Sequence, residues 1–112
     1  MAQKIFDVEG TVKNYVRTLE HQGIHVERAI LFGSYAAGTA RPDSDIDLVI
    51  ISSDLKRYDF PERLGMLSKA TLHVSGPLEV IGYTPEEVRG KEGKSIFWDE
   101  ICSSGREVYK AA

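Results

Sequence analysis

The sequence predicts a mixed α/β (α+β) fold in which helices pack against a small mixed β-sheet. β-Branched and apolar runs at 45–52 and 78–83 have the length and composition of strands. Apolar residues recur at helical spacing across 7–21 and 61–73. Of the 112 residues, 42% are hydrophobic and 28% are charged, which is the composition of a globular protein. A disordered or fibrous chain is therefore excluded.

The first predicted elements are an amphipathic helix and a strand. The helix covers residues 7–21, and Gly23 is a natural stop for it. Its apolar residues are Val8, Val12, Tyr15, Val16 and Leu19. Residues 24–33 are predicted to form a strand that starts half-exposed and ends apolar.

The middle of the chain is predicted to contain a short helical turn, a loop and an interior strand. Small residues at 34–38 suit one or two helical turns, and Pro42 lies in a predicted loop over 39–44. The strand at 45–52 is apolar on both faces beyond Asp47, which indicates that it is covered on each side.

A helix over 61–73, beginning at Pro61, is predicted to precede a third strand at 78–83, with a break at Gly76-Pro77 between them. Thr84-Pro85-Glu86-Glu87 is a capping-box pattern that should begin a short helix.

The remaining residues are predicted to form a polar loop, a last helix and a short end. The loop covers 90–94, and the helix covers 95–102 and ends near Gly105. Val108 and Tyr109 belong to a short closing segment.

Charge and cysteine content limit the partners and the compartment. The net charge of −3, without an obvious basic patch, gives no strong nucleic-acid surface. Cys102 is the single cysteine, which fits a reducing compartment. The start, Met1 to Asp7, lacks the apolar run of a signal peptide, and no run approaches the roughly 20 apolar residues of a membrane span. We therefore expect a cytoplasmic protein with no membrane partner.

Gly33-Ser34 is the first of three features that indicate chemistry. The pair lies where a predicted strand ends and a helical turn begins. A helix start offers unpaired N–H groups to an anion, glycine lets a phosphate approach the backbone, and the serine hydroxyl adds a donor. The alternative is a plain tight turn with a serine cap.

Asp45 and Asp47 are the second feature. The strand period of two puts both carboxylates on one face, roughly 6–7 Å apart. Such carboxylates repel each other, and a bound Mg²⁺ or Mn²⁺ would remove that repulsion. Alternatively, both side chains face solvent at the start of the strand.

Glu79 is the third feature, because it is the one acid in an otherwise apolar strand. If this strand lies beside the strand of Asp45 and Asp47, Glu79 completes a cluster of three carboxylates. The alternative is an edge strand whose glutamate faces water.

The motif spacing resembles that of the DNA polymerase β-like nucleotidyltransferase superfamily. Gly33-Ser34 is followed, after ten residues, by Asp45-Ile46-Asp47, between the apolar runs that end at Leu31-Phe32 and begin at Leu48. The short chain is similar to the minimal nucleotidyltransferases, which often serve as antitoxins (MNT-type) to a helical HEPN-type ribonuclease toxin. The resemblance implies a polymerase β-like nucleotidyltransferase fold and one domain over 1–112.

The resemblance also implies a metal-dependent transfer of AMP from ATP with loss of pyrophosphate. Asp45, Asp47 and Glu79 would be catalytic and would bind two Mg²⁺ ions, with Mn²⁺ as the alternative. Gly33 and Ser34 would bind the β- and γ-phosphates. The implied acceptor is a tyrosine of a HEPN-type toxin, which the chain would silence as an antitoxin. Homo- and hetero-oligomers both remain open.

Two positions depart from the family pattern. Many members have arginine where this chain has Ala37, so Arg41 is the candidate for the missing phosphate contact. The third acid of the family is usually aspartate, whereas this chain has Glu79.

Two alternative functions stay open: a catalytically weak antitoxin that neutralises its partner by binding it, and a nucleotidyltransferase that modifies a small molecule. Phe97-Trp98 is predicted to be core or a partner contact.

Overall fold

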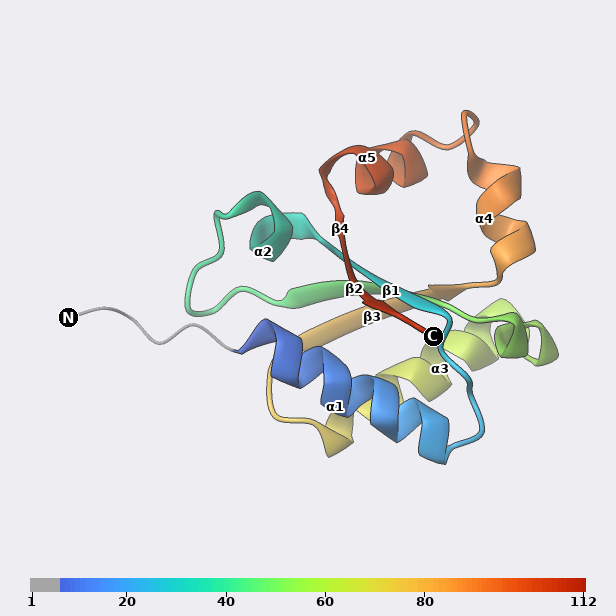
Figure 1. Cartoon of the computed structure of the whole chain (residues 1–112), viewed down its shortest axis with the longest axis horizontal. Helices are drawn as coiled ribbons and strands as arrows, with labels where there is room; N and C mark the ends of the chain where they lie inside the picture. The colour runs from blue at the N-terminus through green and yellow to red at the C-terminus, as the bar shows by residue number, and fades with distance from the viewer. Residues whose placement is uncertain (1–6) are drawn as a thin grey trace.

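The computed structural model describes residues 7–112, which form a four-stranded sheet with helices on both faces (Figure 1). The strands are β1 (Arg28–Phe32), β2 (Ile46–Ile51), β3 (Leu78–Tyr83) and β4 (Arg106–Lys110). The α-helices are α1 (Val8–His21), α2 (Gly33–Ala37), α3 (Phe60–Ala70), α4 (Pro85–Lys91) and α5 (Ile96–Ser104). Two 3₁₀ turns, η1 (Ser53–Arg57) and η2 (Thr71–His73), flank α3.

The sheet is mixed, with the strand order β3-β2-β1-β4. β2 pairs antiparallel with β1 and parallel with β3, and β4 pairs antiparallel with β1. The predicted interior strand is therefore confirmed, because β2 has a neighbour on each side. The predicted mixed sheet is confirmed as well.

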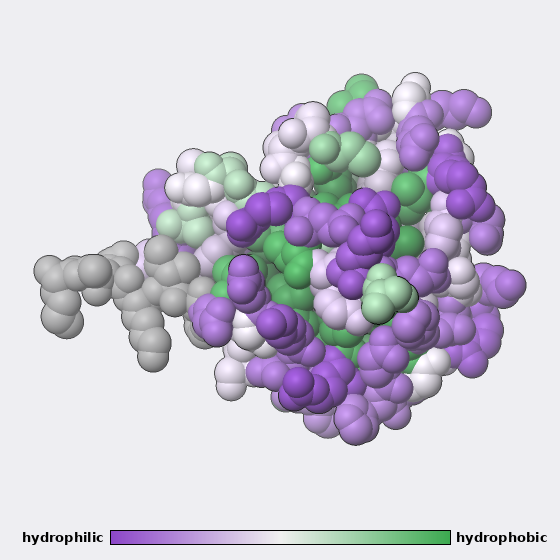
Figure 2. Space-filling model, in the orientation of Figure 1, coloured by the Kyte–Doolittle hydropathy of each residue, from purple (hydrophilic) through white to green (hydrophobic). Residues whose placement is uncertain are grey.

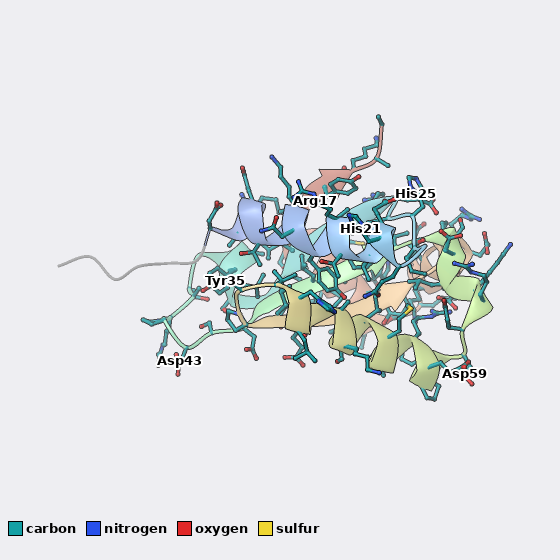
Figure 3. The ribbon with its side chains drawn as sticks, turned by 90° about the horizontal axis from the view of Figure 1, so that it is seen from below. Arg17, His21, His25, Tyr35, Asp43 and Asp59 are labelled. Atoms are coloured by element: carbon teal, nitrogen blue, oxygen red, sulfur yellow. The ribbon has the colours of Figure 1, made fainter. Side chains whose placement is uncertain are left out.

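Side chains of β2 alternate between two packed faces, which explains why its sequence is apolar throughout. The even-numbered side chains are fully buried in the core that α1 and α3 cover: Ile46, Leu48 and Ile50. The odd-numbered side chains beyond Asp47 pack on the opposite face against Trp98 and Ile101 of α5. Figure 3 shows α1 and α3 side by side over the first face.

Helices α1, α3, α4 and α5 begin within one residue of their predicted starts, and each has a local side-chain cap, whereas α2 has none. Asp7 accepts a hydrogen bond from Gly10 N (3.1 Å) at the start of α1. Thr84 and Glu87 form the predicted reciprocal capping box at α4. Ser95 accepts from the backbone N of Trp98 (3.1 Å) and begins α5.

The strand predicted over 24–33 is shorter than expected, since β1 begins only at Arg28. Side chains from elsewhere satisfy the backbone of the preceding residues. His25 N donates to Asp54 Oδ2 (2.8 Å), and Val26 N donates to Glu20 Oε2 (3.0 Å). These N–H groups consequently do not pair with a neighbouring strand.

The short closing segment is the strand β4, which was not predicted as a strand. β4 pairs with β1 at the edge of the sheet, and its mostly charged sequence gives no apolar run. The helix predicted over 61–73 is α3 with the turn η2 after it, and η1 was not predicted. Helix α4 extends to Lys91, into the predicted loop at 90–94.

No helix within residues 7–112 is long and apolar enough to cross a membrane. The predicted lack of a signal peptide concerns the first seven residues, of which 1–6 lie outside the described residues.

Candidate functional site

Three strand ends that carry the predicted site residues meet at one edge of the sheet. β1 ends at Phe32, directly opposite Asp47 of β2. Glu79 of β3 is the in-register neighbour of Asp47 on the other side. In-register residues of a parallel pair point to the same face, so these two carboxylates lie side by side. Asp45 precedes β2 by one residue, and an extended chain returns it to the same face.

The electrostatics of Asp47 reflect this crowding. Burial raises the pKa of its carboxyl, and the charges of Glu79 and Asp45 raise this pKa further. Asp47 is half-buried, whereas Asp45 and Glu79 are exposed. Within residues 7–112, none of the three carboxylates forms an ion pair with a basic side chain. The site therefore holds concentrated negative charge that nothing in the described chain neutralises.

Gly33 lies against the carboxylate of Asp47, and this contact requires glycine. Its φ of +72° is in the left-handed region, which L side chains rarely adopt. A Cβ at this position would overlap Asp47 Oδ2 and would lie 3.1 Å from Asp47 Cγ. The first residue of α2 and the acid of β2 are therefore packed together.

The other predicted phosphate ligands, Ser34 and Arg41, lie in α2 and in the loop before β2. Ser34 is half-buried in the first turn of α2, directly after Gly33. Arg41 is exposed in the loop before β2, where its N donates to Ser44 Oγ (2.8 Å) and its carbonyl accepts from Ser44 N (3.0 Å). Asp43 lies in the same loop, which projects from the body of the protein in Figure 3. Among the described residues, Arg41 forms no ion pair, so its guanidinium is free to meet an anion.

The carboxylates suit a hard divalent cation by their chemistry. Oxygen donors are the ligands of Mg²⁺, which is commonly bound by one or two carboxylates together with substrate phosphates. As the side chains stand in residues 7–112, no three His, Cys, Asp or Glu groups converge closely enough to hold an ion. The residues therefore fit an ion that is shared with a phosphate-bearing ligand, rather than an ion held by protein groups alone.

A cleft lies between α2 and α5, next to the glycine–serine turn. Its volume is about 360 Å³. From the side of β1 and α2 it is lined by Phe32, Gly33, Ser34, Ala37 and Thr39. From α5 it is lined by Phe97, Glu100, Ile101 and Ser104. The cleft and the acids lie on the same side of the sheet, because Phe32 packs with the core cluster of that face.

The α5 side of the cleft was not predicted as part of the site. Phe97 was expected only as a core residue or partner contact, whereas Trp98 next to it is fully buried. Helical spacing could have grouped the cleft residues of α5. Trp98 and Ile101 face the core, and Phe97, Glu100 and Ser104, three and four residues apart, share the adjacent face. Nothing in the sequence, however, shows which other element that face meets.

Comparisons with known proteins identify the family of the chain. A family model described as nucleotidyltransferase domain matches residues 11–100. A Methanocaldococcus jannaschii protein, named as a protein adenylyltransferase, is 29% identical over 103 residues. The match covers 90% of this chain and 97% of that protein.

Solved structures share the fold at low sequence identity. A toxin–antitoxin crystal structure with AMP-PNP has a TM-score of 0.62 at 19% identity, over 92% of this chain and 73% of that one. A nucleotidyltransferase structure from Sulfolobus solfataricus has a TM-score of 0.55 at 18% identity, over 98% and 92%. A variant of the MntA–HpeT toxin–antitoxin has a TM-score of 0.60 at 16% identity, over 92% and 73%. At these identities the likeness concerns the fold alone.

Proposed function

Since the chain belongs to the nucleotidyltransferase domain family, we propose that it transfers AMP from ATP to a hydroxyl group of a partner protein. One observation carries the proposal: Asp47 lies in register with Glu79 and in contact with Gly33. Two acids and a backbone turn open to a phosphate thus share one edge of the sheet. A protein that only binds a partner has no need for crowded carboxylates, because their repulsion opposes folding.

Each site residue has a role in this proposal. Asp45 and Asp47 would hold two divalent cations, Mg²⁺ or Mn²⁺. Glu79 would help to hold the cation that lies nearer the acceptor hydroxyl. When bound, these ions would neutralise the charge that develops around the α-phosphate during an in-line displacement. Glu79 would also take the proton of the attacking hydroxyl at a carboxylate oxygen.

The turn and the loop would orient the triphosphate. The backbone N–H groups of the Gly33-Ser34 turn and the Ser34 hydroxyl would donate to β- and γ-phosphate oxygens. Arg41 would supply the positive charge that Ala37 does not. Positioning and charge neutralisation account for most of the rate enhancement in phosphoryl transfer.

The proposed acceptor is a tyrosine of a helical HEPN-type toxin, and the biological role is that of an antitoxin. The name of the Methanocaldococcus jannaschii relative supports a protein acceptor. The fold likeness to two toxin–antitoxin structures supports a toxin as partner. The reaction is proposed to take place in the cytoplasm, where ATP is available and Cys102 stays reduced.

Mass spectrometry of a candidate toxin, incubated with the chain, ATP and Mg²⁺, tests the proposal. We expect one added AMP on a tyrosine, with release of pyrophosphate, and no addition with the Asp45→Asn, Asp47→Asn double variant. Asp43→Asn is the control, because it makes the same kind of substitution once, in the exposed loop beside the site. Labelling that persists in the double variant would refute the assigned site.

A second candidate function is neutralisation by binding alone. It is favoured by Ala37, because α2 contains no basic side chain that could contact a phosphate. It is also favoured by the exposed side chains of Ile96 and Phe97 on α5. If the Asp45→Asn, Asp47→Asn variant still protects cells against the toxin, this second function is correct. If protection is lost while the complex still forms, the protein acts by catalysis.

A further inference from the structure

Away from the Gly33-Ser34 turn, the cleft between α2 and α5 has a lining that does not suit the phosphates of a nucleotide. Its one charged side chain is the carboxylate of Glu100, and no basic side chain from residues 7–112 lines it. The remaining surface is mainly apolar, with Phe32, Phe97 and Ile101 as its large side chains. A carboxylate repels phosphate and attracts groups that donate hydrogen bonds.

We propose that this cleft receives the nucleoside of the substrate triphosphate and that Glu100 determines specificity by accepting hydrogen bonds from it. The inference rests on the proposed function, and it assigns the orientation of the nucleotide. The phosphates would lie over the turn and the acids, and the sugar and base would extend under α5. The hydroxyl groups of a ribose and the N–H groups of a base are the donors that such a carboxylate recognises.

Size and position agree with this assignment. The cleft of about 360 Å³ falls in the range of small-molecule sites, roughly 300–1,000 Å³. Gly33, which contacts Asp47, and Ser34 both line the cleft. A nucleotide can therefore enter the cleft with its nucleoside while its phosphates stay near the acids.

Phe97 offers a face on which a base can stack. Its side chain is 51% exposed, although it meets the ring of Phe32 edge to face with 6.0 Å between the ring centroids. This contact holds the ring in place before a ligand arrives. Stacking on an aromatic side chain is worth about 1–3 kcal/mol per base in single-stranded nucleic-acid complexes.

Helix α5 fixes Glu100 and Phe97 rigidly. Trp98 and Ile101 are fully buried beneath the helix, with 1% exposure each, and anchor it to the sheet. Figure 1 shows α5 beside α2 on the side of the sheet that lies opposite α1 and α3. In the space-filling view of Figure 2, hydrophobic surface remains visible between the hydrophilic groups of this region.

Calorimetric titration with two probes, ATP and inorganic tripolyphosphate, both with Mg²⁺, tests the inference. If the nucleoside occupies the cleft, Glu100→Gln weakens ATP binding about tenfold and leaves tripolyphosphate binding unchanged. If phosphates occupy the cleft, the same change removes a repulsion and tightens both. Equal or tighter binding of ATP to Glu100→Gln would therefore overturn the inference.

Matched variants separate this site from general effects. Glu92→Gln removes an equal charge near α5 but outside the cleft, and we expect wild-type affinity for both probes. Phe97→Ala should weaken ATP binding alone. Phe60→Ala, which removes an aromatic side chain of similar exposure (46%) on α3, should leave it unchanged. If Phe60→Ala weakens ATP binding as much as Phe97→Ala, the assignment of the base to the cleft is wrong.

The titration also separates this inference from the proposed function. A wild-type protein that binds neither probe refutes both. A wild-type protein that binds both probes, combined with tighter binding in Glu100→Gln, refutes only the position of the nucleoside. The fluorescence of buried Trp98, the single tryptophan, verifies that each variant is folded.

Discussion

Replacing Gly33 with alanine should lower the rate of nucleotidyl transfer about 100-fold although the protein still folds. The new Cβ would overlap the Oδ2 atom of Asp47, so that carboxylate must move. The group that moves is the far end of a flexible side chain. The fold can therefore accommodate the change, whereas a site that depends on the position of this carboxylate cannot.

The size of both effects follows from the structure. The left-handed φ of +72° costs alanine about 1 kcal/mol, and an off-rotamer Asp47 adds about 1 kcal/mol. The sum is about 2 kcal/mol, which is less than the 5–15 kcal/mol stability that is typical of small domains. A displacement of about 1 Å at a catalytic group, in contrast, lowers the rate about 100-fold.

Gly23→Ala is the matched control. Gly23 has the same left-handed conformation (φ +85°), but nothing lies within 4 Å of a Cβ placed there. We expect it to lower the free energy of unfolding by about 1 kcal/mol, measured by urea denaturation, and to leave AMP transfer unchanged. The reasoning fails if Gly33→Ala keeps wild-type transfer, or if Gly23→Ala loses transfer to the same extent.

Three further predictions concern stability and its dependence on pH. Because the folded protein raises the pKa of Asp47, the charged form opposes folding at neutral pH, and this effect disappears as the pH falls below the ordinary value of 3.8. Asp47→Asn should therefore stabilise the metal-free protein at pH 7 by about 0.5 kcal/mol in urea denaturation; a loss of stability would contradict the crowding. Burial acts to raise the pKa of Glu87, but its hydrogen bonds and the charge of Arg63 lower this pKa on balance. The Arg63–Glu87 pair should therefore stabilise the fold above about pH 4.5 and lose that contribution as the pH falls further. Glu87→Gln should lower the free energy of unfolding by about 1–2 kcal/mol at pH 7. It should also reduce the loss of stability below about pH 4.5; if that loss is unchanged, the pair is not its cause. Tyr15→Phe removes the buried hydrogen bond to Leu67 O (2.7 Å) and should lower the free energy of unfolding by about 1 kcal/mol without affecting transfer; a variant as stable as the wild type would show that the bond contributes nothing.

The local elements could be predicted well because their signals lie close together in the chain. The capping box at Thr84 and the cap at Ser95 act over three residues. The apolar run of β2 predicted an interior strand, and the structure places it between β1 and β3. The prediction failed where side chains outside the segment decide: Asp54, 29 residues from His25, and Glu20 accept hydrogen bonds from the backbone before β1.

The family, the fold class and the enzyme class predicted from the motif are confirmed by the family model and the related proteins. The Gly33-Ser34 turn and Asp45-Ile46-Asp47 are adjacent enough in the chain for their spacing to be informative. The catalytic, metal-binding and nucleotide-binding roles of these residues stay predictions, and the experiments above test them.

The sequence by itself determined the acids at 45 and 47, the turn at 33 and the faces on which the strands are buried, because side-chain periodicity acts along the chain. Only the tertiary structure decided that Glu79 lies beside Asp47 and that α5 closes a cleft over Ser34. The register of two strands and the position of a helix depend on the simultaneous packing of many apolar side chains that are far apart in the sequence. No single stretch of sequence carries that information.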